Sequence, residues 1–560
     1  MATSTQDHTA TSQLQPARKS WQEIGAAKRQ DIKDKIAPWV AGLDLPTAEA
    51  QPNATKVPAT VLSKDEVDIT ENYSAEQLVT SLARGDLTAV QTIKAFSKRA
   101  AVAHVLRAKE LDEHLEKTGV PVGPLHGLPR FVSWLSNIDS TETESWLVKK
   151  LRDAGAIFYV KTNVPTSLMD DPCRHHQWCT NRKLAGASVR YPAGVNGVYG
   201  LRTSTGRLPY MGVANSMEGQ EANPSTIGPM ARNIQDLRFM MRKILAMAPW
   251  LEDPKCLPLP WHDDDESTVN ARIASTGLTI GVLTTADELG FDGVVKCHPP
   301  VSRVLRETVA KLEAAGHHVI PFTPPAHSEG TKLVFECLSA DGGYDVHKTL
   351  AASGEPAIPQ VAISYGTALG ERPSKSLNEW WALLQRKYAY QQRYLAYWNS
   401  TASSTRTGRP VDAVVLPLGP SASFEREKGF YIGYTALGNM LDVSAAAIPM
   451  DKVDKAKDVL SESDRQYVPI SDLDRRVWES YNAETFDGTP VAIQVWTRKL
   501  EEEKALAIAQ EVERIVAPNG AIDATLRVVD PPDPSACSYC AKLSLFGGRD
   551  VTVAASFKLL

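Results

Sequence analysis

Apolar positions along this chain follow two alternating patterns, and together they predict an α/β protein. Stretches with an apolar residue at every third or fourth position predict amphipathic helices, and short unbroken apolar runs predict buried strands. A helix, a glycine and a strand follow one another at residues 147–160 and again at 301–321, with Gly155 and Gly316 ending the two helices. This order is typical of helices that pack on a sheet.

Other segments carry the same two patterns. Helices are predicted at residues 20–40, 74–82, 88–115, 237–246 and 498–516, and buried strands at 278–283, 413–417 and 490–495. Ser74 and Thr88 stand at the start of two of these helices, where a hydroxyl oxygen can accept a hydrogen bond from the first turn. Residues 41–60 contain prolines and residues 445–485 are highly charged, so both predict connecting loops.

One segment stands out by its aromatic content. Residues 376–400 carry Trp380, Trp381, Tyr388 and Tyr394 at helical spacing. The pattern predicts a long core helix. A stripe that binds a planar ligand is the alternative interpretation of the same four side chains.

The composition is that of a chain large enough to hold a sizeable core. Its 560 residues are 43% hydrophobic and 23% charged, which is ordinary for a globular protein. We predict three parts. An N-terminal arm and helix cover residues 1–60, the main domain covers residues 61–517, and an atypical tail covers residues 518–560.

Charge and hydropathy limit the classes of partner and the cellular location that the sequence predicts. A net charge of −5 argues against nonspecific binding of nucleic acid, which needs basic patches. No apolar run approaches the roughly 20 residues of a membrane span, so no membrane partner is expected. Residues 1–16 are polar and lack the apolar core of a secretory signal, which predicts a cytoplasmic protein.

The cysteines predict neither a disulfide framework nor a metal site. Seven cysteines are few for a chain of this length. Cys173 and Cys179 flank His175 and His176, but their spacing fits no common zinc pattern and no second ligand pair is evident. No glycine-rich phosphate-binding motif is found either. That the chain needs neither a metal nor an organic cofactor is what the family resemblance described below implies.

The candidate chemistry lies in the stretch Gly186-Ala187-Ser188. Small side chains beside Ser188 allow a substrate to approach the backbone closely. Backbone N–H groups in such a turn can hold a developing oxyanion. Ser188 is therefore a candidate nucleophile for acyl transfer. The alternative is a tight turn in which the serine hydroxyl bonds its own backbone.

The stretch from Gly186 to Pro192 resembles the nucleophile motif of the amidase signature family, Gly-Gly-Ser-Ile-Arg-x-Pro. Further blocks similar to that family occur in the family's order at residues 123–129, 151–165, 215–219, 228–232 and 487–491. Residues 20–24, Ser-Trp-Gln-Glu-Ile, resemble the fungal acetamidase-like branch. Many ordered blocks are more specific than one short motif.

This resemblance implies a fold, an activity and a set of site residues. The family fold is an α/β/α sandwich around a central mixed sheet of many strands, and its members hydrolyse amides through an acyl-serine intermediate. Carried onto this chain, Ser188 is the nucleophile. Gly186 and Ala187 belong to the oxyanion loop, and Arg190 supports it. The implied partner is a small amide substrate, and relatives often form homodimers.

Two parts of the family's Ser-Ser-Lys relay are not found in this chain. The lysine normally follows the block that ends here at Pro129, but residues 130–134 resemble a segment from farther downstream. We infer that the lysine segment is deleted near residue 130. The bridging serine normally lies in a Gly-Gly-Ser-Ser-Gly-Gly run, which residues 170–185 lack. A second alignment would place residues 185–188 on that run, but the downstream Arg190 favours the nucleophile assignment.

A serine without its base is a slow nucleophile, because the hydroxyl keeps its proton. Loss of the base in a serine hydrolase costs on the order of 10⁶ in turnover. An oxyanion hole and substrate binding retain roughly 10³–10⁴ over water. The sequence therefore predicts an impaired amidase. The alternative is a catalytically inactive relative that binds a ligand or a partner protein.

Two questions stay open at the level of the sequence. His126, His175, His176 and Lys183 are candidates to replace the missing base, and their positions favour none of them. An error in the gene model, such as a misplaced intron boundary, would also remove the lysine block, alter residues 170–185 and add the tail. Sequencing the transcript distinguishes such an error from genuine divergence.

Overall fold

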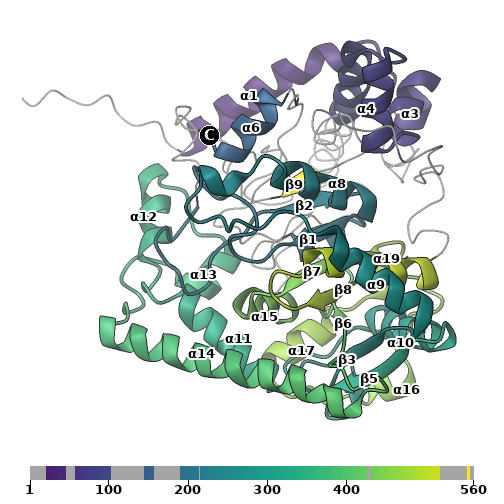
Figure 1. The fold of residues 1–560 in the computed structure, drawn as a ribbon. Coiled ribbons are helices and arrows are strands. Elements are labelled where there is room, and N and C mark those ends of the chain that lie inside the picture. Colours follow the sequence, from purple (N-terminus) through teal and green to yellow (C-terminus); the bar gives the residue numbers. More distant parts are fainter. Residues whose placement is uncertain are drawn as a thin grey trace, which may run out of the picture.

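A mixed sheet lies at the centre of the molecule (Figure 1). The computed structural model describes residues 21–45, 57–102, 144–154, 156, 189–213, 215–424, 431–517 and 552–554. Its strands are β1 (Tyr199–Arg202), β2 (Gly228–Ala231), β3 (Thr279–Thr285), β4 (Glu288–Leu289), β5 (His318–Phe322), β6 (Ala413–Pro417), β7 (Ser444–Lys452), β8 (Pro490–Thr497) and β9 (Thr552–Ala554). They lie in the order β4-β3-β6-β8-β7-β1-β2-β9, and β5 also pairs with β3.

Strand directions confirm the predicted fold class, an α/β protein with a mixed sheet of many strands. β3 runs parallel to β5 and to β6. All other pairs of described strands are antiparallel. A parallel pair needs a crossover connection, and the helix between β3 and β5 supplies one.

The middle of the sheet consists of strands that are buried on both faces. All five residues of β6 are buried, and so are seven of the eight residues of β8. Continuous apolar runs of this kind suit central strands, whereas a half-exposed strand would alternate. Gln494 is the polar exception within the apolar run of β8.

Helices surround the sheet (Figure 1), and within each of two groups the helices pack against one another. One group contains α8 (Ile234–Leu245), α9 (Asp263–Ser275), α10 (Pro299–Ala314) and α19 (Glu502–Val516), and a second contains α11 (His327–Leu338), α14 (Leu377–Ser400) and α15 (Gly433–Leu441). The others are α1 (Trp21–Val40), α2 (Val57–Val61), α3 (Lys64–Glu71), α4 (Ala75–Arg84), α6 (Trp146–Asp153), α7 (Arg190–Val195), α12 (Tyr344–Ser353), α13 (Pro359–Tyr365), α16 (Glu462–Arg465), α17 (Asp472–Glu479) and α18 (Ala483–Phe486).

Two helix starts that the sequence predicts are confirmed by their caps. The Ser74 hydroxyl accepts a hydrogen bond from the backbone N–H of Gln77, whose side chain accepts from the N–H of Ser74 in return. This reciprocal arrangement is a capping box. The Thr88 hydroxyl oxygen accepts from the N–H of Gln91, and residues 89–102 are helical.

The loop predicted at residues 445–485 is wrong. β7 occupies Ser444–Lys452 in the middle of the sheet, and the three short helices α16, α17 and α18 follow. The strand begins Ser-Ala-Ala-Ala-Ile-Pro, and alanine and proline are poor strand formers. Pairing with β1 and β8 on both sides overrides that local preference. A register shift between Pro449 and Asp451 accommodates the proline.

The long helix predicted at residues 376–400 is confirmed as α14, and one of its faces packs into the core as predicted. Its buried residues are Leu383, Tyr390, Tyr394 and Trp398. Trp381 and Tyr388 are 55% and 62% exposed. Aromatic residues at helical spacing therefore lie on two different faces of α14, of which one packs inward and the other faces solvent.

Three other predicted segments are confirmed or described only in part. The predicted loop at 41–60 contains the short helix α2. Residues 157–160 of the strand expected after α6 lie outside the described residues. From the tail 518–560, Thr552–Ala554 form β9, which pairs with β2 at the edge of the sheet.

Candidate functional site

Around the expected nucleophile, the structure describes the chain from Val189 onward, which is one residue after Ser188. Three predicted site residues and the four candidate replacement bases lie outside the described residues, namely Gly186, Ala187, Ser188, His126, His175, His176 and Lys183. The site is therefore built upward from Val189, from Arg190 and from the side chains that hold them.

Val189 has an unusual backbone conformation, with φ 59° and ψ −48°. A positive φ is rare for a β-branched residue and costs of order 1–3 kcal/mol, so the surrounding structure must hold it in place. Gly200 in β1 and Gly228 in β2 make this possible. A Cβ atom at either position would lie 3.2 Å and 2.9 Å, respectively, from the methyl groups of Val189. The chain leaving residue 188 is thus turned sharply and wedged against the sheet.

Arg190 is fully buried at the start of α7. Its guanidinium donates hydrogen bonds to Oε1 of Gln494 at 2.8 Å, to the backbone oxygen of Thr435 at 2.6 Å and to Oδ1 of Asn439 at 2.7 Å. Gly438 allows this approach, since a Cβ atom there would lie 2.8 Å from a guanidinium nitrogen. Arg190 is thereby tied to α15 and to β8 at once.

No carboxylate among the described residues pairs with Arg190, so its charge is held by neutral acceptors alone. Burial, and after it the charge of Arg202, lower the pKa of Arg190 well below its usual value. A guanidinium nonetheless stays protonated in proteins. The result is a buried positive charge two positions along the chain from Ser188, in a medium where charges act strongly.

The loop that follows β6 packs against the other side of α7. The rings of Tyr191 and Phe424 are stacked, with centroids 6.0 Å apart and an interplanar angle of 6°. The Tyr191 hydroxyl donates a hydrogen bond to the backbone oxygen of Ser421 at 3.2 Å. Gly419 leaves room for this ring, because a Cβ atom there would lie 2.1 Å from it. α7 is therefore clamped between β8, α15 and this loop.

The site lies where the carboxyl ends of the parallel strands β3 and β6 meet. The loop after β3 and β4 carries Asp292, and its carboxylate accepts a hydrogen bond from the Tyr431 hydroxyl at 2.6 Å. The N–H of His298 donates to the oxygen of Pro420, in the loop after β6, at 2.8 Å. In open α/β sheets, ligands bind outside the carboxyl ends of the strands. Tyr191, in the described part of the motif, therefore packs beside the loop at the carboxyl end of β6.

Asp292 is a buried carboxyl group that the sequence analysis missed. Backbone N–H groups of Val294 and Val295 donate to one of its oxygens at 2.9 Å and 3.0 Å. Burial raises the pKa of Asp292 to about 6, although its hydrogen bonds act in the opposite direction. The pKa values of Tyr431 and Tyr434 beside it are raised well above the usual value, chiefly by burial. This cluster is neutral or singly charged near neutral pH.

His298 is the described histidine that is tied to the loop clamping α7. Its Nδ1 lies 2.9 Å from the Ser421 hydroxyl, and its Nε2 donates to the oxygen of Val477 at 2.7 Å. Complete burial lowers its pKa to about 4. Both ring nitrogens are occupied, so His298 holds the loop in place and is not a free base.

Sequence reasoning also missed the residues that hold Arg190. Gln494 was the one accessible signal, because it is the single amide within the apolar run Val-Ala-Ile-Gln-Val-Trp of β8. A polar side chain in a strand that is buried on both faces must find a partner. Its Oε1 accepts from Arg190 and Trp496, and its Nε2 donates to the oxygens of Pro417 and Tyr434.

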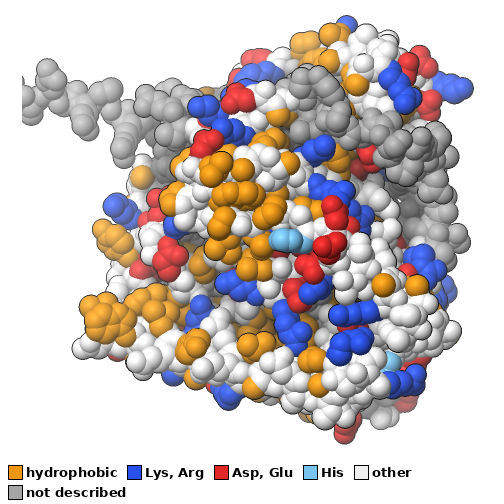
Figure 2. All heavy atoms as spheres, in the orientation of Figure 1, with side chains coloured by type: hydrophobic (Ala, Val, Ile, Leu, Met, Phe, Trp, Pro, Cys, Tyr) orange, Lys and Arg blue, Asp and Glu red, His pale blue; other side chains and the backbone are white. Residues whose placement is uncertain are grey.

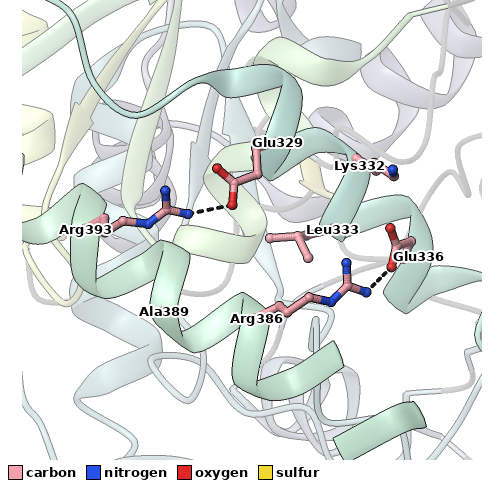
Figure 3. Close-up of a pocket in the computed structure, with 7 residues that line it drawn as sticks. All are labelled: Glu329, Lys332, Leu333, Glu336, Arg386, Ala389 and Arg393. Carbon is pink, nitrogen blue, oxygen red and sulfur yellow. Dashed lines mark hydrogen bonds and ion pairs between the residues drawn. The ribbon is translucent and has the colours of Figure 1, made fainter. Parts of the chain in front are cut away.

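A separate hollow of about 320 Å³ lies between α11 and α14 (Figure 3). Arg386 and Arg393 of α14 form ion pairs with Glu336 and Glu329 of α11 across it. Leu333 and Ala389 line it between the two pairs, and Lys332 lies at its edge. Arg190, the predicted site residue that the structure describes, does not line this hollow.

Two properties of the described residues concern metal binding and membrane insertion. They contain no cluster of three or more histidine, cysteine or acidic side chains placed to hold a metal ion. None of their helices is long and apolar enough to cross a membrane. The cytoplasmic location stays a prediction.

Comparison with known proteins identifies a family model and several similar proteins. The family model described as Amidase matches residues 185–506, which include α7 and everything that clamps it. The chain is 36% identical to "Acetamidase" of Emericella nidulans over 89% of this chain and 98% of that protein. It is 35% identical to "Acetamidase" of Aspergillus oryzae over 89% of this chain and 99% of that protein.

A solved structure described as "Fatty acid amide hydrolase" has a similar fold. The TM-score is 0.73 at 25% sequence identity, covering 89% of this chain and 95% of that one. The fold and the extent of these matches lead to the same conclusion. The chain belongs to the amidase signature family.

Proposed function

We propose that this chain hydrolyses a small carboxamide slowly, through an acyl intermediate on Ser188. In the first step the serine oxygen bonds to the carbonyl carbon, the C–N bond breaks, and the nitrogen leaves as ammonia or an amine that carries away the proton of the serine hydroxyl. Water then releases the carboxylic acid. The similarity to two fungal acetamidases supports a small substrate.

The observation that carries this proposal is that the backbone at Val189 and Arg190 is held in one fixed position. A strained φ at Val189 and three hydrogen bonds from the buried Arg190 fix the backbone directly after the expected nucleophile. Strained backbone tends to persist where it serves a site. A fixed positive charge in a poorly solvated region favours negative charge that develops nearby, as it does on an oxyanion.

The slow rate follows from residues that the sequence lacks, and not from the fixed backbone at Val189 and Arg190. The family's lysine and bridging serine are not found near residue 130 or in residues 170–185. A serine hydroxyl that keeps its proton attacks a carbonyl slowly. The expected turnover is therefore on the order of 10⁶ below that of a complete relay, with the oxyanion loop and substrate binding still contributing.

The same two missing segments favour a second candidate function. A relative that retains the loop and the fold but lacks the base would bind an amide-like ligand or a partner without cleaving it. The two candidates differ in one chemical property, the nucleophilicity of Ser188. A fluorophosphonate probe measures that property directly, because labelling needs an activated hydroxyl.

The test compares the purified chain with Ser188→Ala and with the control Ser403→Ala, an exposed serine on the 3₁₀ turn after α14. We expect slow hydrolysis of aliphatic and aryl amides by the original chain and by the control, and a lower rate for Ser188→Ala, in which only the oxyanion loop and substrate binding still contribute. Equal rates for all three proteins would end the Ser188 assignment. Amide binding without hydrolysis or probe labelling would establish the noncatalytic relative.

A further inference from the structure

Asp292 is a buried acid that the proposed reaction does not use. Figure 2 shows charged side chains of both signs next to one another at the surface, where such residues usually lie. Asp292, in contrast, is only 2% exposed. Its two oxygens accept hydrogen bonds from the N–H groups of Val294 and Val295 and from the Tyr431 hydroxyl. A buried carboxyl group is costly unless it is hydrogen-bonded, so Asp292 in turn fixes the groups that bond it.

The Tyr431 ring lies over the start of α15. Gly433 is the first residue of this helix, and a Cβ atom there would clash with the Tyr431 hydroxyl. Glycine allows the ring to approach the backbone this closely. The ring of Tyr434 packs edge-on against that of Tyr431, with centroids 6.0 Å apart, and its hydroxyl donates to the oxygen of Val295 at 2.8 Å. The loop that carries Asp292 thus holds α15 through two tyrosines.

α15 depends on this support because its first residues provide no cap. The helix begins after Ile432, whose apolar side chain cannot accept a hydrogen bond from the first turn. Helix ends fray where their free N–H groups lack partners. The bond from Tyr431 to Asp292, at 2.6 Å, and that from Tyr434 to Val295 therefore fix the start of α15 from outside the helix.

Residues 431–435 also hold Arg190, which follows the expected nucleophile by two positions. The backbone oxygen of Thr435 accepts a hydrogen bond from the Arg190 guanidinium at 2.6 Å. The backbone oxygen of Tyr434 accepts from Nε2 of Gln494 at 3.0 Å, and Oε1 of Gln494 accepts from Arg190. One segment of five residues therefore connects Asp292 at its first residue with Arg190 at its last.

The same segment contacts α7 a second time. The Ile432 side chain packs against the apolar cluster that contains Tyr191 and Val195 of α7 and Phe424 of the loop after β6. A shift of residues 431–435 would therefore move a hydrogen-bond acceptor of Arg190 and an apolar contact of Tyr191 together. Both effects act on the backbone directly after Ser188.

The position of that backbone matters more when the base is missing. An oxyanion loop and substrate binding then supply the catalysis that remains, roughly 10³–10⁴ over water. Misplacement of reacting groups by about 1 Å, caused by a change far from the chemistry, can cost about 10²-fold in rate. Residues that fix the loop therefore control the rate that this chain retains.

We propose that Asp292 is a positioning residue for amide hydrolysis, and that it acts through Tyr431 and residues 431–435 on the backbone at Val189 and Arg190. The inference rests on the proposed function, because it concerns the rate of that reaction. The oxyanion forms only in the transition state, so misplacing the loop should lower kcat more than it changes KM. A residue that only stabilised the fold would change the free energy of unfolding and leave both constants of the folded protein as they are.

The first experiment compares Tyr431→Phe with the matched control Tyr467→Phe. Tyr467 donates to Asp474 at 2.6 Å, so the control removes a tyrosine–aspartate bond of the same length on the connection between α16 and α17. With an aryl amide as substrate, Tyr431→Phe should lower kcat by about 10- to 10²-fold and change KM by less than about twofold. Tyr467→Phe should change neither constant.

The second experiment asks whether a conservative substitution preserves the function. In Asp292→Asn, the amide oxygen can still accept from the N–H groups of Val294 and Val295, and the amide nitrogen can donate to the Tyr431 oxygen. Asp292→Asn should therefore lose less kcat than Asp292→Ala, which removes every one of these bonds. If Asp292→Ala does not fold, the comparison of Asp292→Asn with Tyr431→Phe replaces it, and Asn should again lose less.

The third experiment does not need turnover. Hydrogen exchange of peptides covering residues 189–196 and 431–441 should be faster in Tyr431→Phe than in the original chain, and unchanged in Tyr467→Phe. If the original chain hydrolyses no amide, the proposed function fails, and the exchange of residues 189–196 decides whether Asp292 positions α7. Unchanged exchange there, or an unchanged kcat in Tyr431→Phe of an active chain, would overturn the inference.

Discussion

The guanidinium of Arg190 lies 2.8 Å from Oε1 of Gln494, and the two residues are 304 positions apart in the sequence. This bond joins the first turn after the expected nucleophile to the central strand β8 of the sheet. The Gln494 amide is itself fixed by Trp496 and by two backbone oxygens. The position of the candidate loop therefore depends on the centre of the core and not on local turn chemistry.

The first prediction concerns the length and shape of this side chain. Arg190→Lys keeps the charge, but one ammonium group cannot reach Gln494, Thr435 and Asn439 together. We expect the free energy of unfolding to fall by about 2–4 kcal/mol, because buried acceptors lose charged donors. Urea titration measures this. Arg475→Lys, in an exposed pair with Asp472, is the control and should change stability by less than about 0.5 kcal/mol.

The second prediction concerns the space beside α7. Gly419→Ala would place a Cβ atom 2.1 Å from the ring of Tyr191, so the ring or the loop must move. We expect a loss of about 1–3 kcal/mol in the free energy of unfolding, as for an overpacked core. Any amide hydrolysis should fall with it, because α7 carries the residues next to Ser188.

A second substitution separates this clash from a backbone effect of alanine. Tyr191→Leu removes the ring atoms that the new Cβ meets, so it should destabilise the chain alone but restore part of the stability lost in Gly419→Ala. A double-mutant cycle over the four proteins should therefore give a favourable coupling energy. Additive losses would show that Gly419 and Tyr191 do not contact each other.

The fold could be predicted from the sequence where propensity and burial agree, and not where they conflict. β6 and β8 are apolar runs rich in β-branched residues, so they are recognised as strands. β7 is equally central, but its alanines and Pro449 disfavour a strand, and only its pairing with β1 and β8 decides. Long-range pairing of this kind leaves no local signal.

The candidate site likewise has one part that the sequence predicts and one part that it does not. The motif around Ser188 locates the site in the sequence because its chemistry is local. The residues that hold Arg190 lie 245 to 304 positions away and come from α15 and β8. Their spacing in the sequence carries no information about their meeting in space. Gln494 alone gave a local hint, because an amide in an unbroken apolar strand needs a partner.

The third prediction concerns Asp292, whose pKa burial raises to about 6. The folded protein then binds a proton more tightly than the unfolded chain between about pH 4 and pH 6. The contribution of Asp292 to the free energy of unfolding therefore falls as the pH rises through this range, by about 3 kcal/mol in all. Asp292→Asn keeps the shape of the neutral acid and removes its titration.

Stability of both proteins at pH 4.5 and pH 7.5 checks this sign. Relative to the original chain, Asp292→Asn should be more stable at pH 7.5 than at pH 4.5. A difference that does not change with pH would mean that the carboxyl group titrates equally in both states. The Tyr431 hydroxyl, which donates to Asp292 at 2.6 Å, is the partner to examine in that case.

The fourth prediction has the opposite sign and concerns His298. Its pKa is lowered to about 4 by burial, from an ordinary value of 6.5. The unfolded chain therefore binds a proton that the folded protein refuses, and stability is lost as the pH falls from about 6.5 towards 4. The loss amounts to about 3 kcal/mol over this range. His327 adds a loss in the same direction, since burial lowers its pKa to about 3.

Comparison with a His298→Gln variant isolates this one imidazole. A glutamine can still donate to the oxygen of Val477 and accept from the Ser421 hydroxyl, so the loop after β6 keeps its tether. We expect the variant to be less stable at pH 7.5 but to lose less stability on acidification than the original chain. Because the tether holds the loop that clamps Tyr191, acid should also release α7 before the sheet unfolds. If the free energy of unfolding changed equally with pH in the two proteins, His298 would have to be solvated. Its burial would then not contribute to the loop that clamps Tyr191.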